Sequence, residues 1–127
     1  MRFLLDSTVI IDHLNGIEAA EAFLRAHALD SCISVVTVNE VLAGSEPEAV
    51  RGHELLLDQF ACLEVGQLTA KGSAALRRAH RWKLADSIQA ALALNEGLKL
   101  VTRNHRDFKP AKHAFVIVPY KLSSRKG

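Results

Sequence analysis

The stretch Phe3-Leu4-Leu5-Asp6-Ser7-Thr8 decides the fold, because a short apolar run stops at an acid followed by two hydroxyl residues. We expect residues 2–5 to form a buried strand. A helix should then run from about Ser7 to Leu14 and end near Asn15-Gly16, a pair typical of helix C-termini. In an open α/β sheet, ligands collect at the carboxyl ends of the strands. Asp6 is therefore expected at the edge of a sheet where binding sites form.

The rest of the chain alternates between strand-like and helix-like segments. Apolar runs predict four more strands, at 32–35, 60–65, 98–101 and 115–118. Helical spacing and turn residues predict helices at 17–28, 37–43, 47–57, 69–81 and 86–96. This alternation indicates a three-layer α/β fold, with a mostly parallel five-stranded sheet and helices on both faces. We expect one domain over residues 1–120 and a frayed basic tail over 121–127.

Composition favours a cytoplasmic globular protein. Hydrophobic residues make up 49% of the 127 residues, which is enough for a packed core. No signal peptide is recognisable, and no apolar run approaches the ~18 residues that a membrane span needs. Cys32 and Cys62 lie in apolar strand-like segments, so we expect buried free thiols rather than a disulfide.

Charge is unevenly distributed along the chain. Residues 1–63 carry three basic and ten acidic residues, whereas residues 64–127 carry thirteen basic and four acidic ones. Two acids of the basic half are Asp86 and Asp107. Among so many cations they could form structural ion pairs, or they could belong to an acidic metal pocket rimmed by Lys and Arg. The second arrangement suits a polyphosphate substrate, so charge mildly favours nucleic acid.

Four acids stand beside an apolar strand or near the start of a helix: Asp6, Glu40, Asp86 and Asp107. Each has a possible structural role, because Asp6 and Asp86 could cap helices, Glu40 could form a capping box with Thr37, and Asp107 could shape a turn. Their joint placement favours a site instead, since all four are expected at one edge of the sheet. Carboxylates that converge there would repel one another unless cations held them together.

Other polar and aromatic residues allow both structural and functional interpretations. Asp12 lies on the first helix, about one and a half turns past Asp6, so we expect it to face elsewhere. Arg103 and Arg106 flank the fourth acid and could either hold phosphates or remain solvated. Trp82 could stack on a base but is better explained as the anchor of a corner, and His105 as an exposed turn residue. The six His residues show no paired spacing, which argues against metal-independent acid–base catalysis.

The chain resembles PIN-domain ribonucleases, in particular the VapC-type toxins of bacterial toxin–antitoxin pairs. The resemblance rests on four segments, namely residues 3–12, 34–41, 84–91 and 100–108. It implies Mg²⁺ or Mn²⁺ at the acids and cleavage of single-stranded RNA. Asp6, Glu40 and Asp86 match the three core acids of the family, and Asp107 matches a more variable fourth. The resemblance also implies a cognate antitoxin, and we expect a homodimer.

Three further residues match supporting positions of the family. Ser7 and Thr102 stand where hydroxyl groups support the acids, and Asn104 stands where many relatives have an acid. Whether Asn104 or Asp107 contacts metal, and whether one ion or two bind, stays open. The expected function is that of a toxin, a metal-dependent endoribonuclease that cuts transfer or ribosomal RNA. The alternative is a catalytically silent PIN scaffold that binds RNA or a protein partner.

Overall fold

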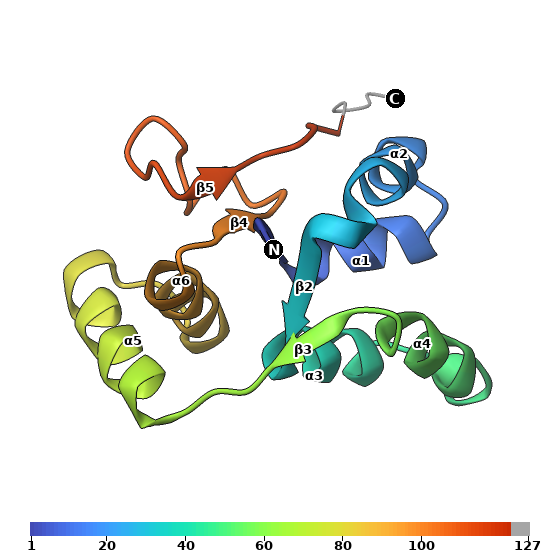
Figure 1. Cartoon of the computed structure of the whole chain (residues 1–127), viewed down its shortest axis with the longest axis horizontal. Coiled ribbons are helices and arrows are strands. Elements are labelled where there is room, and N and C mark those ends of the chain that lie inside the picture. The colour runs from blue at the N-terminus through green and yellow to red at the C-terminus, as the bar shows by residue number, and fades with distance from the viewer. Residues whose placement is uncertain (123–127) are drawn as a thin grey trace.

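Five short strands form one parallel sheet at the centre of the molecule (Figure 1). The computed structural model describes residues 1–122. The strands are β1 (Phe3–Leu5), β2 (Ser31–Ser34), β3 (Ala61–Leu63), β4 (Lys99–Val101) and β5 (Val116–Ile117). Their order across the sheet is β3-β2-β1-β4-β5, and every pair is parallel. The central strand β1 therefore ends beside both β2 and β4, which brings the segments that follow these strands to one edge.

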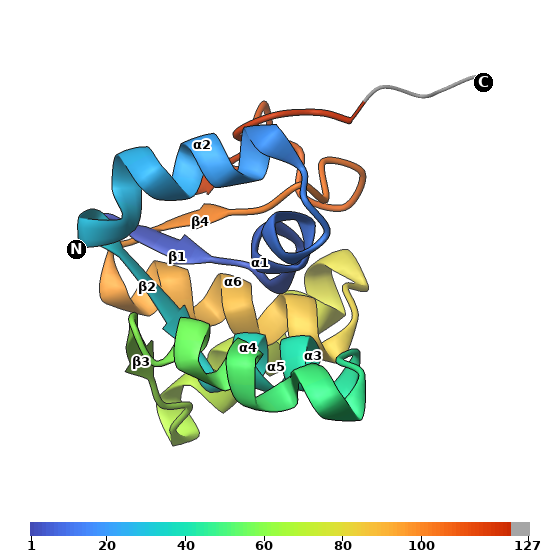
Figure 2. The ribbon, with the colours of Figure 1, turned by 90° about the vertical axis from the view of Figure 1, so that its right-hand side faces the viewer.

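Helices cover both faces of this sheet (Figure 2). They are α1 (Ser7–Leu14), α2 (Glu18–His27), α3 (Val35–Ala43), α4 (Val50–Leu57), α5 (Gln67–His80) and α6 (Leu84–Glu96), with short 3₁₀ turns at Ala28–Asp30 and Pro47–Ala49. One core cluster joins Leu4 to apolar residues of α6. The other joins Phe3 and Leu5 to residues of α1 to α4. Successive residues of β1 thus point to opposite faces, as the pleat of a strand requires. The predicted three-layer fold is confirmed.

Three sequence-based expectations about local structure were wrong. Helix α3 begins at Val35 and is capped by Ser34, whose Oγ accepts from the amides of Val36 and Thr37, so Thr37 and Glu40 do not form a capping box. Helix α6 begins at Leu84 and follows α5, so Asp86 does not open a helix that leaves a strand. Ser34 is the N-cap residue of α3 because it ends β2 with its backbone in the extended conformation that an N-cap requires.

The third error concerns a cysteine. Both thiols are free and Cys32 is buried, as predicted, but Cys62 is exposed because β3 is an edge strand. Within residues 1–122, no helix is both long and apolar enough to cross a membrane. Most of the tail that we expected to fray, residues 123–127, lies outside the described residues.

Candidate active site

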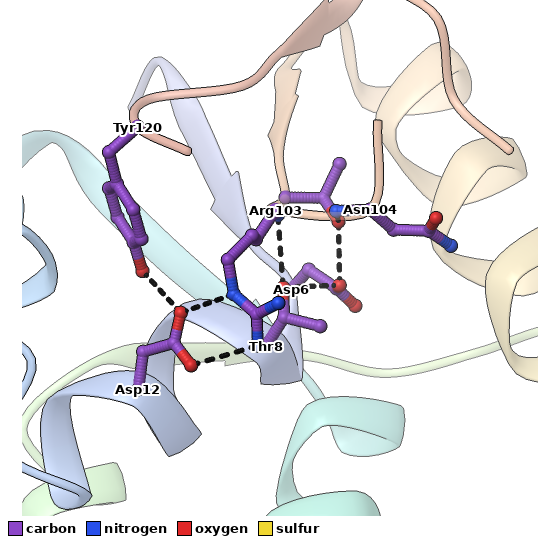
Figure 3. Close-up of polar contacts among 7 residues, drawn as sticks. Asp6, Thr8, Asp12, Arg103, Asn104 and Tyr120 are labelled. Carbon is purple, nitrogen blue, oxygen red and sulfur yellow. Dashed lines mark hydrogen bonds and ion pairs between the residues drawn. The ribbon is translucent and has the colours of Figure 1, made fainter. Parts of the chain in front are cut away.

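Asp6 is buried at the carboxyl end of β1, with 4% of its surface exposed. It occupies the N-cap position of α1, yet its side chain makes no capping hydrogen bond. Its Oδ2 accepts instead from Thr8 Oγ1 at 2.9 Å and from Thr102 Oγ1 at 2.8 Å (Figure 3). Thr102 directly follows β4, so the hydroxyl of the neighbouring strand end orients this carboxylate. The helix-cap explanation for the Asp6 side chain is therefore wrong.

Glu40 reaches the same edge from α3. Its Oε1 accepts from Ser7 Oγ at 2.7 Å, and Ser7 is the residue that follows Asp6. The two hydroxyl residues expected to support the acids, Ser7 and Thr102, thus each donate to one of them. Thr8 adds a third hydroxyl that the sequence did not single out for this role.

Asp86 lies in the first turn of α6 and is half-buried. Burial, and after it the charges of Asp6, Asp107 and Glu40, raise the pKa of its carboxyl to about 6, while Lys83 opposes them. Within the described residues this carboxylate accepts no hydrogen bond that would stabilise its charge. The other three acids therefore lie close enough to act on Asp86 electrostatically, which places all four around one region of the sheet edge.

A buried amide links α6, which carries Asp86, to α3, which carries Glu40. Gln89 Nε2 donates to Thr37 Oγ1 at 2.8 Å, and Ser34 Oγ donates to Gln89 Oε1 at 2.7 Å. Both contacts are buried, where a satisfied polar network is specific in geometry. Asp86 and Glu40 each stand three residues from a member of this network, so the bridge joins the two helix segments that carry them. Gln89 was not predicted as a site residue because its partners lie more than fifty residues away in the sequence.

The fourth acid belongs to the loop that leaves β4. Asn104 Nδ2 donates to Asp107 Oδ2 at 3.1 Å, and the Asp107 amide donates to Asn104 Oδ1 at 3.2 Å. The Asn104 amide in turn donates to Thr102 Oγ1. Asn104 and Asp107 are thus locked to each other in a turn, with Asp107 the more exposed of the two. The loop links the fourth acid, through Thr102, to Asp6.

The donor set fits a hard divalent cation in its chemistry. Carboxylate oxygens are what Mg²⁺ and Mn²⁺ prefer, and a cation would offset the repulsion that raises the pKa of Asp86. Among residues 1–122, however, no three Asp, Glu, His or Cys side chains converge closely enough to hold a metal ion as they stand. The acids share a region without forming a closed cage.

Two candidates for substrate contact differ in their surroundings. Arg103, expected to hold phosphate, donates from Nε and Nη2 to Asp12 at 2.6 and 3.0 Å. Asp12 does face away from the acids, as expected, but it is buried in this ion pair and also accepts from Tyr120 at 3.0 Å. Arg106 is exposed and lines a cleft of about 400 Å³ beside Asp107.

Trp82 and His105 match their simpler interpretations. Trp82 is buried, with its ring 4.3 Å from that of His80 in a stack and 4.7 Å from that of Phe108. It anchors the corner between α5 and α6, which leaves its ring little surface for stacking on a base. His105 is exposed in the loop after β4.

Comparison with known proteins identifies the family of the chain. Residues 3–113 match the model of the PIN domain, and the chain belongs to this family. A toxin–antitoxin complex from Klebsiella pneumoniae contains a chain of 32% identity with a TM-score of 0.86, covering 94% of this chain and 98% of that one.

Further solved structures share the fold. FitAcB from Neisseria gonorrhoeae has 27% identity and a TM-score of 0.76, covering 92% and 97% of the two chains. The DNA-bound VapBC from Salmonella typhimurium has 23% identity and a TM-score of 0.73, covering 86% and 91%. A search of the curated proteins found no match. The resemblance to VapC-type PIN toxins that the sequence indicated is thereby confirmed.

Proposed function

We propose that this PIN domain is a metal-dependent endoribonuclease and the toxin of a toxin–antitoxin pair. The observation that carries the proposal is the electrostatic convergence of Asp6, Glu40 and Asp107 on Asp86 at the carboxyl edge of the sheet. A purely structural set of acids would be neutralised by ion pairs, but within residues 1–122 none of these four forms one. The similarity to the Klebsiella toxin–antitoxin complex supports the biological role.

Asp6, Glu40 and Asp86, with Asp107, are the proposed ligands of Mg²⁺ or Mn²⁺. The bound ion would supply an activated water and neutralise charge that develops on the phosphoryl oxygens. The chain itself supplies orientation. Thr102 holds Asp6, and Ser7 holds Glu40, each through one carboxylate oxygen. This fixes two carboxylates before substrate arrives.

Single-stranded RNA is the proposed substrate, and the basic half of the chain supplies a surface for it. A cleft of about 260 Å³ between the α5–α6 corner and the loop after β4 is lined by Arg81, Arg106, Lys109 and Lys112 together with Asp107. Within residues 1–122, none of these four cations takes part in an ion pair. We propose that they hold RNA phosphates next to the acids, because unpaired cations in a cleft bind a polyanion.

We also propose a protein partner, an oligomeric state and a cellular location. A cognate antitoxin follows from the neighbours, which are toxin–antitoxin complexes. The proposed oligomer is a homodimer, and the proposed location is the cytoplasm, where cellular RNA is available.

Cleavage of labelled single-stranded RNA by the purified protein tests the enzymatic proposal. We expect cleavage with Mg²⁺ or Mn²⁺, none in EDTA, and a loss of about 100-fold or more in Asp6→Asn. Glu18→Gln, which removes an exposed acid of α2, is the matched control and should cleave normally. Undiminished cleavage in EDTA would rule out the metal mechanism. RNA binding without cleavage under any metal would instead favour the silent scaffold.

The fourth acid is expected to matter less than the core acids. Asp107 is exposed and shares its turn with Asn104, so Asp107→Asn should retain more activity than Asp6→Asn or Asp86→Asn. Parallel rate measurements over a Mn²⁺ titration would show this. An equal and complete loss in Asp107→Asn would make it a core ligand.

A further inference from the structure

Asp12 is a buried carboxylate directly behind the acidic edge. Only 3% of its surface is exposed, and three donors surround it. Arg103 binds it with two nitrogens, and the Tyr120 hydroxyl donates to its Oδ2 (Figure 3). This bidentate pairing is the geometry that guanidinium and carboxylate prefer, and it offsets the cost of burying the charge.

Arg103 begins at the acidic edge but does not point to it. Its amide donates to Thr8 Oγ1 at 3.1 Å, and the same Thr8 hydroxyl donates to Asp6. Thr102, the residue before it, also donates to Asp6. Figure 3 shows the long cationic side chain leaving this backbone toward Asp12, to which its guanidinium is joined by two hydrogen bonds. A guanidinium attached at this point and free to move could pair either with Asp12 or with the acids of the site.

The charges of both Asp12 and Asp6 act on Arg103. Its pKa is raised chiefly by the hydrogen bond to Asp12 and by the charge of Asp12, and the charge of Asp6 adds to the effect. Asp6 thus attracts the Arg103 guanidinium even while Asp12 holds it. What keeps the cation in place is the bidentate geometry and the third donor from Tyr120.

We propose that Asp12 is a positioning residue that holds Arg103 off the acidic edge, so that the carboxylates stay open to a divalent cation. The inference rests on the proposed metal-dependent function. If Asp12 loses its charge, Arg103 gains more by pairing with the acids of the site, and a tethered cation there competes with the metal. Tyr120 strengthens the hold by supplying its hydroxyl to the same carboxylate.

The test combines metal binding with a double substitution. Calorimetric titration of Mn²⁺ into the protein without RNA, and RNA cleavage over a Mn²⁺ series, are measured for the wild type, Asp12→Asn, Arg103→Gln and the double variant. Asp12→Asn should weaken Mn²⁺ binding by about tenfold. The double variant should bind Mn²⁺ within about twofold of Arg103→Gln, because the competing cation is gone. Glu21→Gln is the control, since it releases Arg25 from an exposed ion pair on α2.

A purely structural ion pair predicts a different pattern. In that case the double variant binds Mn²⁺ no better than Asp12→Asn, and this result would overturn the inference.

Melting curves show whether each variant is folded. If Asp12→Asn does not fold, Tyr120→Phe with and without Arg103→Gln gives the same comparison in milder form, with a loss of about two- to threefold that the second change removes. A wild type that binds no Mn²⁺ would defeat the proposed function and this inference with it. Normal binding in both wild type and Asp12→Asn would defeat only the inference.

Discussion

The raised pKa of the Asp86 carboxyl means that its charged form destabilises the folded protein when no metal is bound. Its folded-state pKa of about 6 lies above the ordinary value, so the fold favours the protonated form. The stability that comes with protonation is fully present below about pH 4 and is lost as pH rises through about 6. At neutral pH the folded protein is therefore less stable, and in return Asp86 carries the charge that binds a cation.

Asp86→Asn should remove this pH dependence. We expect the metal-free variant to melt at a higher temperature than the wild type at pH 7.5, with the gap shrinking toward pH 4.5. Calorimetric melting at the two pH values, in EDTA, measures the gap, and Glu18→Gln serves as the control for a solvated acid. Adding Mg²⁺ at pH 7.5 should raise the melting temperature of the wild type alone. A gap of equal size at both pH values would show that the stabilising effect is not due to the Asp86 charge.

Among individual residues, those that lie next to the ends of neighbouring strands were predicted from the sequence. Ser7 and Thr102 were found by resemblance, and both donate to acids of the site. Gln89 and the Asp12–Arg103 pair were not predicted, because their roles depend on partners brought together only by the sheet order. Thr37 illustrates the limit well, since its local pattern suggested a capping box while its hydroxyl donates across the core to Leu5.

The corner between α5 and α6 combines a strained backbone with a concentration of positive charge. Helix α5 ends at His80, and its C-cap residue is Arg81, whose φ of 60° lies in the left-handed region that favours glycine. Its amide closes the helix on the Arg77 carbonyl at 2.8 Å. Glycine would serve this cap better, so an arginine here is poorly explained by stability and better explained by its charge in the cleft beside Asp107.

Arg81→Gly should therefore separate stability from RNA binding. We expect the free energy of unfolding to rise by about 1 kcal/mol or less, because the left-handed strain is relieved. RNA affinity should fall, and the slope of log affinity against log salt should decrease by about 1. Fluorescence anisotropy in EDTA, on an Asp6→Asn background, measures binding without cleavage. Arg25→Gln is the control on the α2 surface. Unchanged RNA affinity would exclude Arg81 from the RNA-binding surface.

Most elements were predictable because the apolar runs are short and clearly bounded. Strands β1 and β4 match their expected positions closely. β1 is an uninterrupted apolar segment that ends before Asp6, and β4 is apolar except for Lys99 and ends before Thr102. Helix starts were less predictable. Ser34 competes with Thr37 as a cap, and α6 starts at Leu84, just after the corner where Trp82 packs on Phe108. The exposure of Cys62 depends on strand order, which no local pattern reveals.

The fold places the acidic region next to the cationic cleft lined by Arg81, Arg106, Lys109 and Lys112, and this combination constrains what can inhibit the protein. RNA can use the cations, while the acids attract a divalent ion or a positively charged group. A protein partner that occupies the acids must supply cations of its own. An extended segment with a basic side chain would meet Asp6, Glu40 and Asp86 where metal is proposed to bind. The exposed and half-buried apolar residues of the segment 17–28, such as Ile17 and Phe23, offer additional contact.

Expression of the chain alone should arrest growth, and co-expression of a small cognate partner should relieve the arrest. If a basic side chain of the partner binds the acids of the site, the purified complex should bind Mg²⁺ more weakly than the isolated chain. The reason is that the partner and Mg²⁺ require the same carboxylates. Calorimetric titration of Mg²⁺ into complex and isolated chain measures the difference. Expression of Asp6→Asn is the control for toxicity and should permit growth. Full inhibition with unchanged Mg²⁺ affinity would contradict direct occupation and indicate a partner that covers the cationic cleft beside Arg81 and Arg106, so that RNA is kept from the site.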